Sequence, residues 1–560
     1  MSSLLIFLSC SGGGGNGATS DIATIRVEPA VLELTVTNGE PGVAEFTAIA
    51  ELLSGGEAPL DLVSWSISNL SSGTITSDGA FTSVDTNGGI TEIIASHDGI
   101  EGAATVAVVY KTNIFEDGLS ESIAEAFEAA SVQSVDTLIM DYPLDQVTVP
   151  RNLTGLSFIW TDETGTAAPA YRIRFRSDIT DISVYTTETL WPSTQTLWEL
   201  ISAANKRGEV EVTIEAASWD GGSLGDVWQG LPSTLTVNRL DARGSVLYWA
   251  TSDEAILRIP FGSTDSELFW EGDNECTGCH ALVQTDDGAG DTMVVTHGGV
   301  DGRFSVIDVA EPSIPEQIVG TSDSNRMTFK TVSPDGQFIL GTNNQTATLY
   351  ELRSGNRIKD FQFDDRVTHP DWSPDGETIL MVLAKRTISG QNFIINSDME
   401  FERGEIIEVD WDADAQSLGD MRVLKAADTA VSFYYPAYSP DGEWIAYNRS
   451  TITSYAAVDA ELWLMSRDGS TDIRLKNANG TGDLQNSYPR WGPLPDDDVL
   501  WLAFSSRRTY AVQPNAMPQI WVAAILPELA ESGDDPSSAP FWLPGQDPTS
   551  DNHLPVWWAQ

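Results

Sequence analysis

The chain carries one short motif whose residue types and spacing suit covalent attachment of a cofactor, Cys276-Thr277-Gly278-Cys279-His280. Cysteine occurs three times and histidine five times in 560 residues, so chance would place this Cys-x-x-Cys-His pattern in roughly one such chain in ten thousand. In c-type haem attachment the two thiols add to the haem vinyl groups, and the adjacent imidazole becomes an axial iron ligand. We therefore interpret Cys276, Cys279 and His280 as a site for covalent haem c.

Two other interpretations of this motif stay open. Cys276 and Cys279 could form a local disulfide or remain a reduced thiol pair, with His280 as a bystander, although a disulfide needs no adjacent histidine. A zinc site is less favoured, because the sequence has no second Cys/His pair to complete four ligands.

The first residues resemble a bacterial lipoprotein signal. A short apolar run over residues 4–8 leads through Ser9 to Cys10, and a Gly/Ser/Asn tract follows. In that family the cysteine is lipidated and becomes the new N-terminus, which implies an outer-membrane lipoprotein facing the periplasm or the cell surface. Export suits haem c, whose attachment takes place outside the bacterial cytoplasm. An ordinary cleaved signal or a disordered tail is the alternative.

The charge of the chain is strongly negative. It has 30 Lys and Arg against 82 Asp and Glu, which gives a formal net charge of -52. Such a surface repels nucleic acid phosphates and anionic lipid headgroups, so we expect no nucleic acid partner. It could attract a basic partner, or it could simply reflect a saline habitat. After residue 10 no run of about 18 apolar residues indicates a membrane span.

The N-terminal half predicts two β domains after the signal and linker of residues 1–21. Residues 22–110 alternate apolar and polar positions between regularly spaced turns, which predicts a small antiparallel sandwich. The stretch Val63–Asn69 and the glycines that follow it resemble the bacterial immunoglobulin-like module, with Trp65 as its core tryptophan. Residues 111–240 resemble a fibronectin type III domain, with expected helices over 120–130 and 197–205.

Residues 241–560 contain a repeat. Ser-Pro-Asp-Gly occurs at 333–336, 373–376 and 439–442, each time before an apolar strand, and the spacing predicts radially repeated four-stranded blades. These residues resemble the TolB-type β-propeller family, which implies a six-bladed propeller and interaction with envelope proteins. Pro555–Trp558 is expected to be the inner strand of the blade that begins near residue 245. The predicted fold class is therefore all-β throughout.

Aligning the blades places several candidate ligands at matching strand entries. His369-Pro370, Tyr435-Pro436 and Tyr488-Pro489 correspond, His553 precedes the matching Leu554, and His280 lies at a similar entry. Such entries meet at one mouth of the central channel. His280 would be the proximal iron ligand, and the sixth position would go to His369, which we prefer, or to His553 or water. His297 is a weaker candidate. For His369 and His553 the alternative is a structural histidine at a blade start.

These observations support two classes of function. The first is an exported, lipid-anchored propeller with one haem c, acting with a redox partner in electron transfer or as a sensor. The second is a cell-surface scaffold that binds a protein or glycan, with a structural Cys276–Cys279 disulfide and no cofactor. The sequence shows no nucleophile–base constellation, so an enzyme is not favoured.

Overall fold

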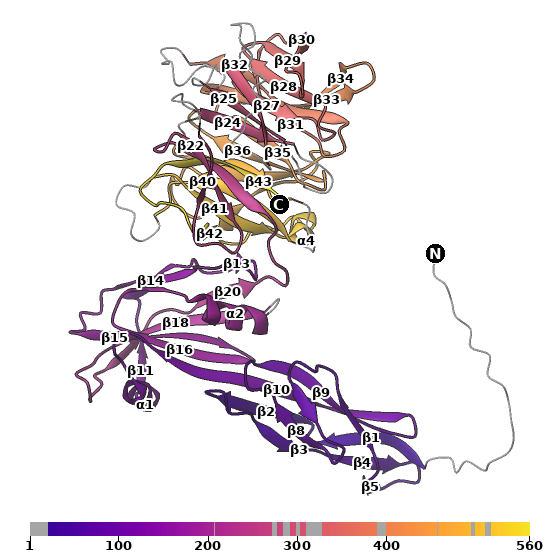
Figure 1. Ribbon diagram of the computed structural model, residues 1–560, viewed down its shortest axis with the longest axis vertical. Coiled ribbons are helices and arrows are strands. Elements are labelled where there is room, and N and C mark those ends of the chain that lie inside the picture. The colour runs from indigo at the N-terminus through magenta and orange to yellow at the C-terminus, as the bar shows by residue number, and fades with distance from the viewer. Residues whose placement is uncertain are drawn as a thin grey trace, which may run out of the picture. The chain divides into compact units, whose positions relative to one another are not determined.

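The regular structure of the described residues is almost entirely β-strand (Figure 1). The computed structural model describes residues 21–205, 208–271, 277–283, 292–297, 303–309, 327–388, 399–455, 457–493, 499–509 and 517–559, with the backbone alone at 277–279, 297 and 303. Within these ranges there are four short helices, and the rest of the regular structure is strand, which confirms the predicted all-β class. None of the helices in this part of the chain is long and apolar enough to cross a membrane.

One compact unit comprises the described residues up to Asn113 together with Asp178–Ile182. Strands β1-β4-β5 and β3-β8-β7 form two sheets, and β9 pairs antiparallel with β6 and β10. The expectation of a wholly antiparallel sandwich is wrong at one strand, because β2 pairs in parallel with β10. The long chain segment between these two strands supplies the crossover that a parallel pair needs. The strands are β1 (Ile22–Glu28), β2 (Val31–Thr37), β3 (Val43–Glu45), β4 (Thr47–Leu52), β5 (Glu57–Leu60), β6 (Ser64–Ile67), β7 (Gly73–Ile75), β8 (Ala80–Ser83), β9 (Gly89–His97) and β10 (Ile100–Phe115).

The core of this unit is formed by alternate residues of its strands. Phe46 and Phe81 are buried at its centre, together with Ile93 and Val106. Trp65, which we expected in the core, is only half-buried and packs against this cluster from its edge. The sequence pattern identified the strand but not the depth of its tryptophan.

The second unit begins with residues 114–177 and 183–240. Its helices α1 (Glu121–Ala129) and α2 (Gln195–Ala204) confirm the two that we expected, and β15 and β18 form an antiparallel pair over most of their length. The sequence also predicts a strand over Tyr142–Asp145, but only Tyr142 is in a strand, and Pro143–Asp145 form a bend and the start of a turn because Pro143 cannot donate to a ladder. The strands are β11 (Val132–Ser134), β12 (Leu138–Tyr142), β13 (Val147–Val149), β14 (Ser157–Asp162), β15 (Pro169–Ser177), β16 (Thr180–Thr186), β17 (Leu190–Pro192), β18 (Glu209–Ser218), β19 (Val227–Gln229) and β20 (Ser233–Val237).

From residue 245 onward the described residues form six sheets, which we call blades 1 to 6. Blade 1 contains β21 (Ser245–Ala250), β22 (Ala255–Pro260), β23 (Glu267–Glu271) and β43 (Asn552–Trp558); blade 2 contains β24 (Thr277–Leu282), β25 (Thr292–His297) and β26 (Arg303–Asp308); blade 3 contains β27 (Phe329–Val332), β28 (Phe338–Asn343), β29 (Thr346–Glu351) and β30 (Arg357–Gln362). Blade 4 contains β31 (Arg366–Trp372), β32 (Thr378–Thr387), β33 (Phe401–Asp412) and β34 (Ser417–Lys425); blade 5 contains β35 (Ser432–Tyr438), β36 (Trp444–Ser450), β37 (Glu461–Ser466) and β38 (Asp472–Arg474); blade 6 contains β39 (Ser487–Trp491), β40 (Leu500–Ser506), β41 (Gln519–Ile525) and β42 (Phe541–Trp542). Two short helices, α3 (Lys476–Asn479) and α4 (Pro527–Glu531), lie in connections.

The blades close into a ring through the C-terminal strand. The inner strands contact one another in the order β24-β27-β31-β35-β39-β43, and β43 in turn contacts β24. Strand β43 pairs antiparallel with β21, with Trp558 opposite Ser245 and Trp557 opposite Val246. This confirms the predicted closure of a six-bladed propeller and leaves the inner edge of blade 1 covered.

The Ser-Pro-Asp-Gly motif makes the turn between the first two strands of blades 3, 4 and 5, as predicted. In blade 4 the buried Ser373 hydroxyl accepts the Thr378 backbone N–H at 2.9 Å and donates to Asp375 at 2.6 Å. Gly376 follows with a φ of 75°, a conformation that a side chain disfavours. The motif thus fixes the turn and satisfies a buried donor at the same time.

We predict that Ser373→Ala destabilises the propeller by about 1–3 kcal/mol, because it leaves the Thr378 N–H buried without an acceptor. Chemical denaturation followed by tryptophan fluorescence measures this change. Ser470→Ala is the matched control, since Ser470 lies in an exposed turn and its loss should change stability by less than about 0.5 kcal/mol. Equal effects of the two substitutions would contradict this role of the motif.

Candidate functional site at the channel mouth

The inner strand of blade 4 is interrupted by a bulge at His369-Pro370. Thr368 pairs with Val382 and Asp371 with Leu380, so two residues of β31 stand opposite the single residue Met381 of β32. A bulge of this kind re-aims side chains and raises the local twist. His369 has a φ of 47°, which is a costly conformation for a residue with a side chain.

The same bulge recurs around the ring. Each copy is a residue at positive φ followed by proline, and in each the ladder shifts by one residue. The copies are Tyr435-Pro436 in β35 with φ 48°, Tyr488-Pro489 in β39 with φ 58°, and Leu554-Pro555 in β43 with φ 50°. Four repeats of one strained conformation mean that the surrounding blades impose it.

The haem-type motif occupies this bulge in blade 2. In β24, Gly278 pairs with Thr296 and Ala281 with Val294, so the unpaired pair is Cys279-His280. Cys279 therefore matches His369, and His280 matches Pro370. The prediction from the sequence, which matched His280 rather than Cys279 to His369, is therefore shifted by one residue. Cys276 lies outside the described residues, as does Cys10, and of Cys279 only the backbone is described.

Blade 3 departs from the pattern. Its inner strand β27 pairs without a shift, Phe329 with Thr342 and Lys330 with Gly341. At this point β27 has one residue fewer than the inner strand of blade 4, and it has no proline. Lys330 therefore stands where the other blades carry their bulge, and it brings a cation to the ring.

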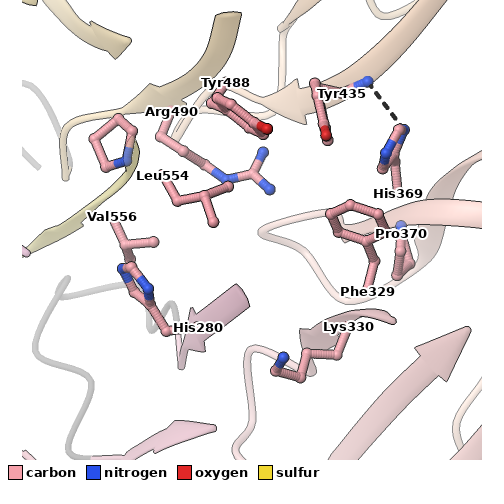
Figure 2. Close-up of a pocket in the computed structure, with 11 residues that line it drawn as sticks. His280, Phe329, Lys330, His369, Pro370, Tyr435, Tyr488, Arg490, Leu554 and Val556 are labelled. Atoms are coloured by element: carbon pink, nitrogen blue, oxygen red, sulfur yellow. Dashed lines mark hydrogen bonds between the residues drawn. The ribbon is translucent and has the colours of Figure 1, made fainter. Parts of the chain in front are cut away.

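These inner-strand residues enclose one pocket, shown in Figure 2. Its unfilled space is about 470 Å³ when the open mouth is counted. The guanidinium of Arg490 reaches into the space that His280 and His369 border from opposite sides (Figure 2). The lining residues, contributed by all six blades, are His280, Phe329, Lys330, His369, Pro370, Tyr435, Tyr488, Arg490, Leu554, Pro555 and Val556.

His280 presents a neutral imidazole to this pocket. It is 8% exposed, and neither ring nitrogen makes a hydrogen bond of normal geometry within the described part of the chain, although the Leu247 backbone lies near enough to influence its pKa. Burial lowers its pKa to about 3, with a further contribution from the positive charge of Lys330, while the backbone of Leu247 opposes this change. An imidazole of this kind keeps a lone pair available, which is what an iron ligand requires.

His369 lines the same pocket but is oriented as a donor. It is 4% exposed, and its Nδ1 accepts the Tyr435 backbone N–H at 3.4 Å. Burial, and then the charge of Arg490, hold its pKa well below the ordinary value, so the ring is neutral and carries its proton on Nε2. That nitrogen is buried without a described acceptor. As an iron ligand, His369 would first have to give up this tautomer.

The two remaining candidates contribute less. His553 does not line the pocket: its ring lies 6.0 Å from that of Tyr488 and 6.5 Å from that of Trp249, and burial, with a smaller effect of Arg507, lowers its pKa to about 4. The side chain of His297 lies outside the described residues.

Sequence reasoning missed the two cations of the site, Lys330 and Arg490. Arg490 follows the bulge of blade 6 directly, in the register that Asp371 occupies in blade 4. Burial raises the pKa of Asp371 to about 6, although Arg490 and the Tyr438 N–H, 2.9 Å from the carboxylate, oppose this rise. A comparison of the residues that directly follow each X-Pro pair in the sequence would have identified Arg490 and Asp371 as equivalent positions.

Several described residues are of the kinds that border a haem, while the thiols of the motif lie outside the described side chains. The pocket supplies a neutral buried histidine from the motif, apolar and aromatic walls, and two cations that can face acidic groups of a cofactor. In the described part of the chain, no group of three or more His, Cys, Asp or Glu could hold a metal ion.

The closed ring of six sheets, with a histidine- and arginine-lined channel mouth, defines this part of the chain as a six-bladed β-propeller. No family model matches the sequence, and no curated protein matches it either.

Several solved structures are similar to the chain. TolB from Acinetobacter baumannii is 12% identical with a TM-score of 0.38, over 64% of this chain and 80% of that one. A putative TolB from Agrobacterium tumefaciens is 16% identical with a TM-score of 0.31, over 56% and 97%. A chain of a nidogen/laminin complex is 10% identical with a TM-score of 0.36, over 56% of this chain and 97% of that one. The assignment of the propeller rests on the strand pairing of the chain itself.

Proposed function

We propose that this protein is an exported β-propeller of the bacterial cell envelope that carries one covalent haem c for electron transfer or sensing. The observation that supports the proposal most is the position of the motif: Cys279-His280 forms an inner-strand bulge, and His280 borders the channel mouth. Cys276 and Cys279 would hold the cofactor through their sulfur atoms, and His280 would be an axial ligand. When bound, haem supplies reversible one-electron chemistry.

The residues of the pocket have distinct roles in this proposal. His280 stays neutral because it is buried, so its lone pair is not lost to a proton at ordinary pH. Phe329, Leu554 and Val556 limit the access of water. Lys330 and Arg490 add positive charge, which favours the more electron-rich state of a nearby redox centre.

Neither of the other two candidate histidines would be a second protein ligand to the iron in this proposal. His369, our first choice from the sequence, donates through Nε2 in its neutral tautomer, and His553 lies outside the pocket lining.

A second candidate function is a binding scaffold without cofactor, with a Cys276–Cys279 disulfide. The specific observation in its favour is the lining of the pocket, in which Lys330 and Arg490 supply two cations for a small anionic ligand. The absorbance spectrum of protein matured with the haem-attachment machinery separates the two. The haem proposal predicts a Soret band, whereas the scaffold proposal predicts that this band is absent.

The export part of the proposal predicts that Cys10→Ser moves the protein from the membrane to the soluble fraction, because the lipid would be attached at that sulfur. Detergent-phase partitioning of protein expressed with its complete signal measures this. Ser9→Ala is the control and should leave the protein in the membrane fraction. Equal partitioning of Cys10→Ser and wild type would rule out the anchor.

A further inference from the structure

We infer that the channel mouth also contains a carboxylate-binding site, formed by Arg490, Lys330 and the Nε2–H of His369. This inference goes beyond the haem proposal and does not depend on it, since none of these three residues belongs to the Cys-x-x-Cys-His motif. The charged head of a small organic carboxylate would face the cations, and its carbon part would face the apolar wall.

Arg490 has unused donors. Within the described ranges its guanidinium makes one hydrogen bond, to the Pro489 carbonyl at 3.3 Å, and no ion pair with a carboxylate. Its five N–H groups form a planar fork that matches a carboxylate in two parallel bonds. Figure 2 shows this fork in the open space of the pocket.

The potential in the pocket is positive. Arg490 lowers the pKa of His280, His369 and Asp371, so its charge is felt on both sides of the mouth. Lys330 adds to it at His280. The carboxyl of Asp371 is already engaged by the Tyr438 N–H, and burial raises its pKa, which weakens its competition with a ligand. The chain as a whole has a net charge of -52, so the two cations of the pocket contrast with its overall negative charge.

His369 adds a directional donor. Because its Nδ1 accepts the Tyr435 N–H, its Nε2–H is left buried without a described acceptor, in a residue that lines the pocket. An unmet buried donor costs free energy unless a ligand satisfies it. Phe329, Leu554 and Val556 border the same space and supply apolar contact. Together these residues favour an organic carboxylate over an inorganic anion.

The test uses calorimetric titration of full-length protein with acetate, butyrate and succinate at constant ionic strength in chloride. One sample is Cys276→Ser/Cys279→Ser, which cannot hold haem covalently, and the other is matured wild type. We expect saturable binding to the first sample. Arg490→Gln and Lys330→Met should each weaken it about tenfold or more. Arg474→Gln, which removes an ion pair with Glu461 on blade 5, is the control and should leave binding unchanged.

The two samples separate the sources of the carboxylate. Binding to both identifies a free organic acid as the ligand, whereas binding to the haem-free sample alone shows that carboxylates of the cofactor occupy the site. Absence of binding to haem-free protein with a native near-ultraviolet circular dichroism spectrum would overturn the inference. The inference would also be overturned if folded haem-free protein bound the carboxylates with the same affinity with and without Arg490→Gln. If haem attachment alone failed, titration of the Cys276→Ser/Cys279→Ser protein would still test the carboxylate site.

Discussion

Removal of residues 552–560 is expected to unfold the propeller rather than merely loosen its end. These residues include β43, the inner strand of blade 1, whose Val556, Trp557 and Trp558 are each about 95% buried. Trp557 also donates from Nε1 to the Arg243 carbonyl at 2.8 Å and stacks on Phe261 at 4.7 Å. Burial of each large side chain contributes about 1.5–3 kcal/mol, so three of them plus the strand's hydrogen bonds approach a typical total stability of about 5–15 kcal/mol.

The measurement is near-ultraviolet circular dichroism and protease resistance of the full chain with and without this segment. Removing residues 559–560 alone is the control, because it spares β43, and it should change neither signal. Because the chain has more than one domain, the propeller's own transition is followed through cleavage after residue 245. A truncated protein with wild-type resistance in residues 245–551 would contradict closure through β43.

The second large effect is expected at the motif. Cys276→Ala/Cys279→Ala should abolish haem-linked peroxidase staining on a denaturing gel, because thioether bonds survive denaturation and coordination alone does not. His280→Ala should keep the stain, since both thiols remain, but shift the Soret band, since a buried pocket histidine no longer ligates the iron.

His97→Ala is the matched control for the histidine, because His97 lies in the first unit and its Nδ1 contacts the Leu62 carbonyl at 2.6 Å. It should change neither stain nor spectrum. His369→Ala should leave both the stain and the spectral type unchanged, because His369 Nδ1 is engaged by the Tyr435 N–H and its Nε2 carries a proton. A stain that persists in the double cysteine variant would disprove covalent attachment at this motif.

The sequence predicts the parts of the fold that repeat. The Ser-Pro-Asp-Gly turns mark blades 3 to 5 because each turn needs the same glycine conformation and the same buried serine. The unpaired strand at Pro555–Trp558 predicts the closure, because an open inner edge would leave donors unmet. By contrast, the parallel pairing of β2 with β10 leaves no local mark, since alternation is the same in either direction.

The candidate site is predictable in location but not in register. The X-Pro pairs identify the channel mouth, yet the one-residue bulge that matches Cys279 with His369 is visible only in the ladder. Lys330 has no X-Pro pair to mark it, because blade 3 lacks the bulge. The tautomer of His369 depends on the Tyr435 N–H from the next blade, a contact between residues 66 positions apart.

The most direct test of covalent haem at Cys276 and Cys279 is the intact mass of wild-type protein, matured with functional haem-attachment machinery and then denatured. We expect the mass of the polypeptide plus one haem, with Cys276 and Cys279 protected from alkylation after reduction. The mass of the bare polypeptide, with both cysteines alkylated only after reduction of a disulfide, would contradict it and favour the binding scaffold.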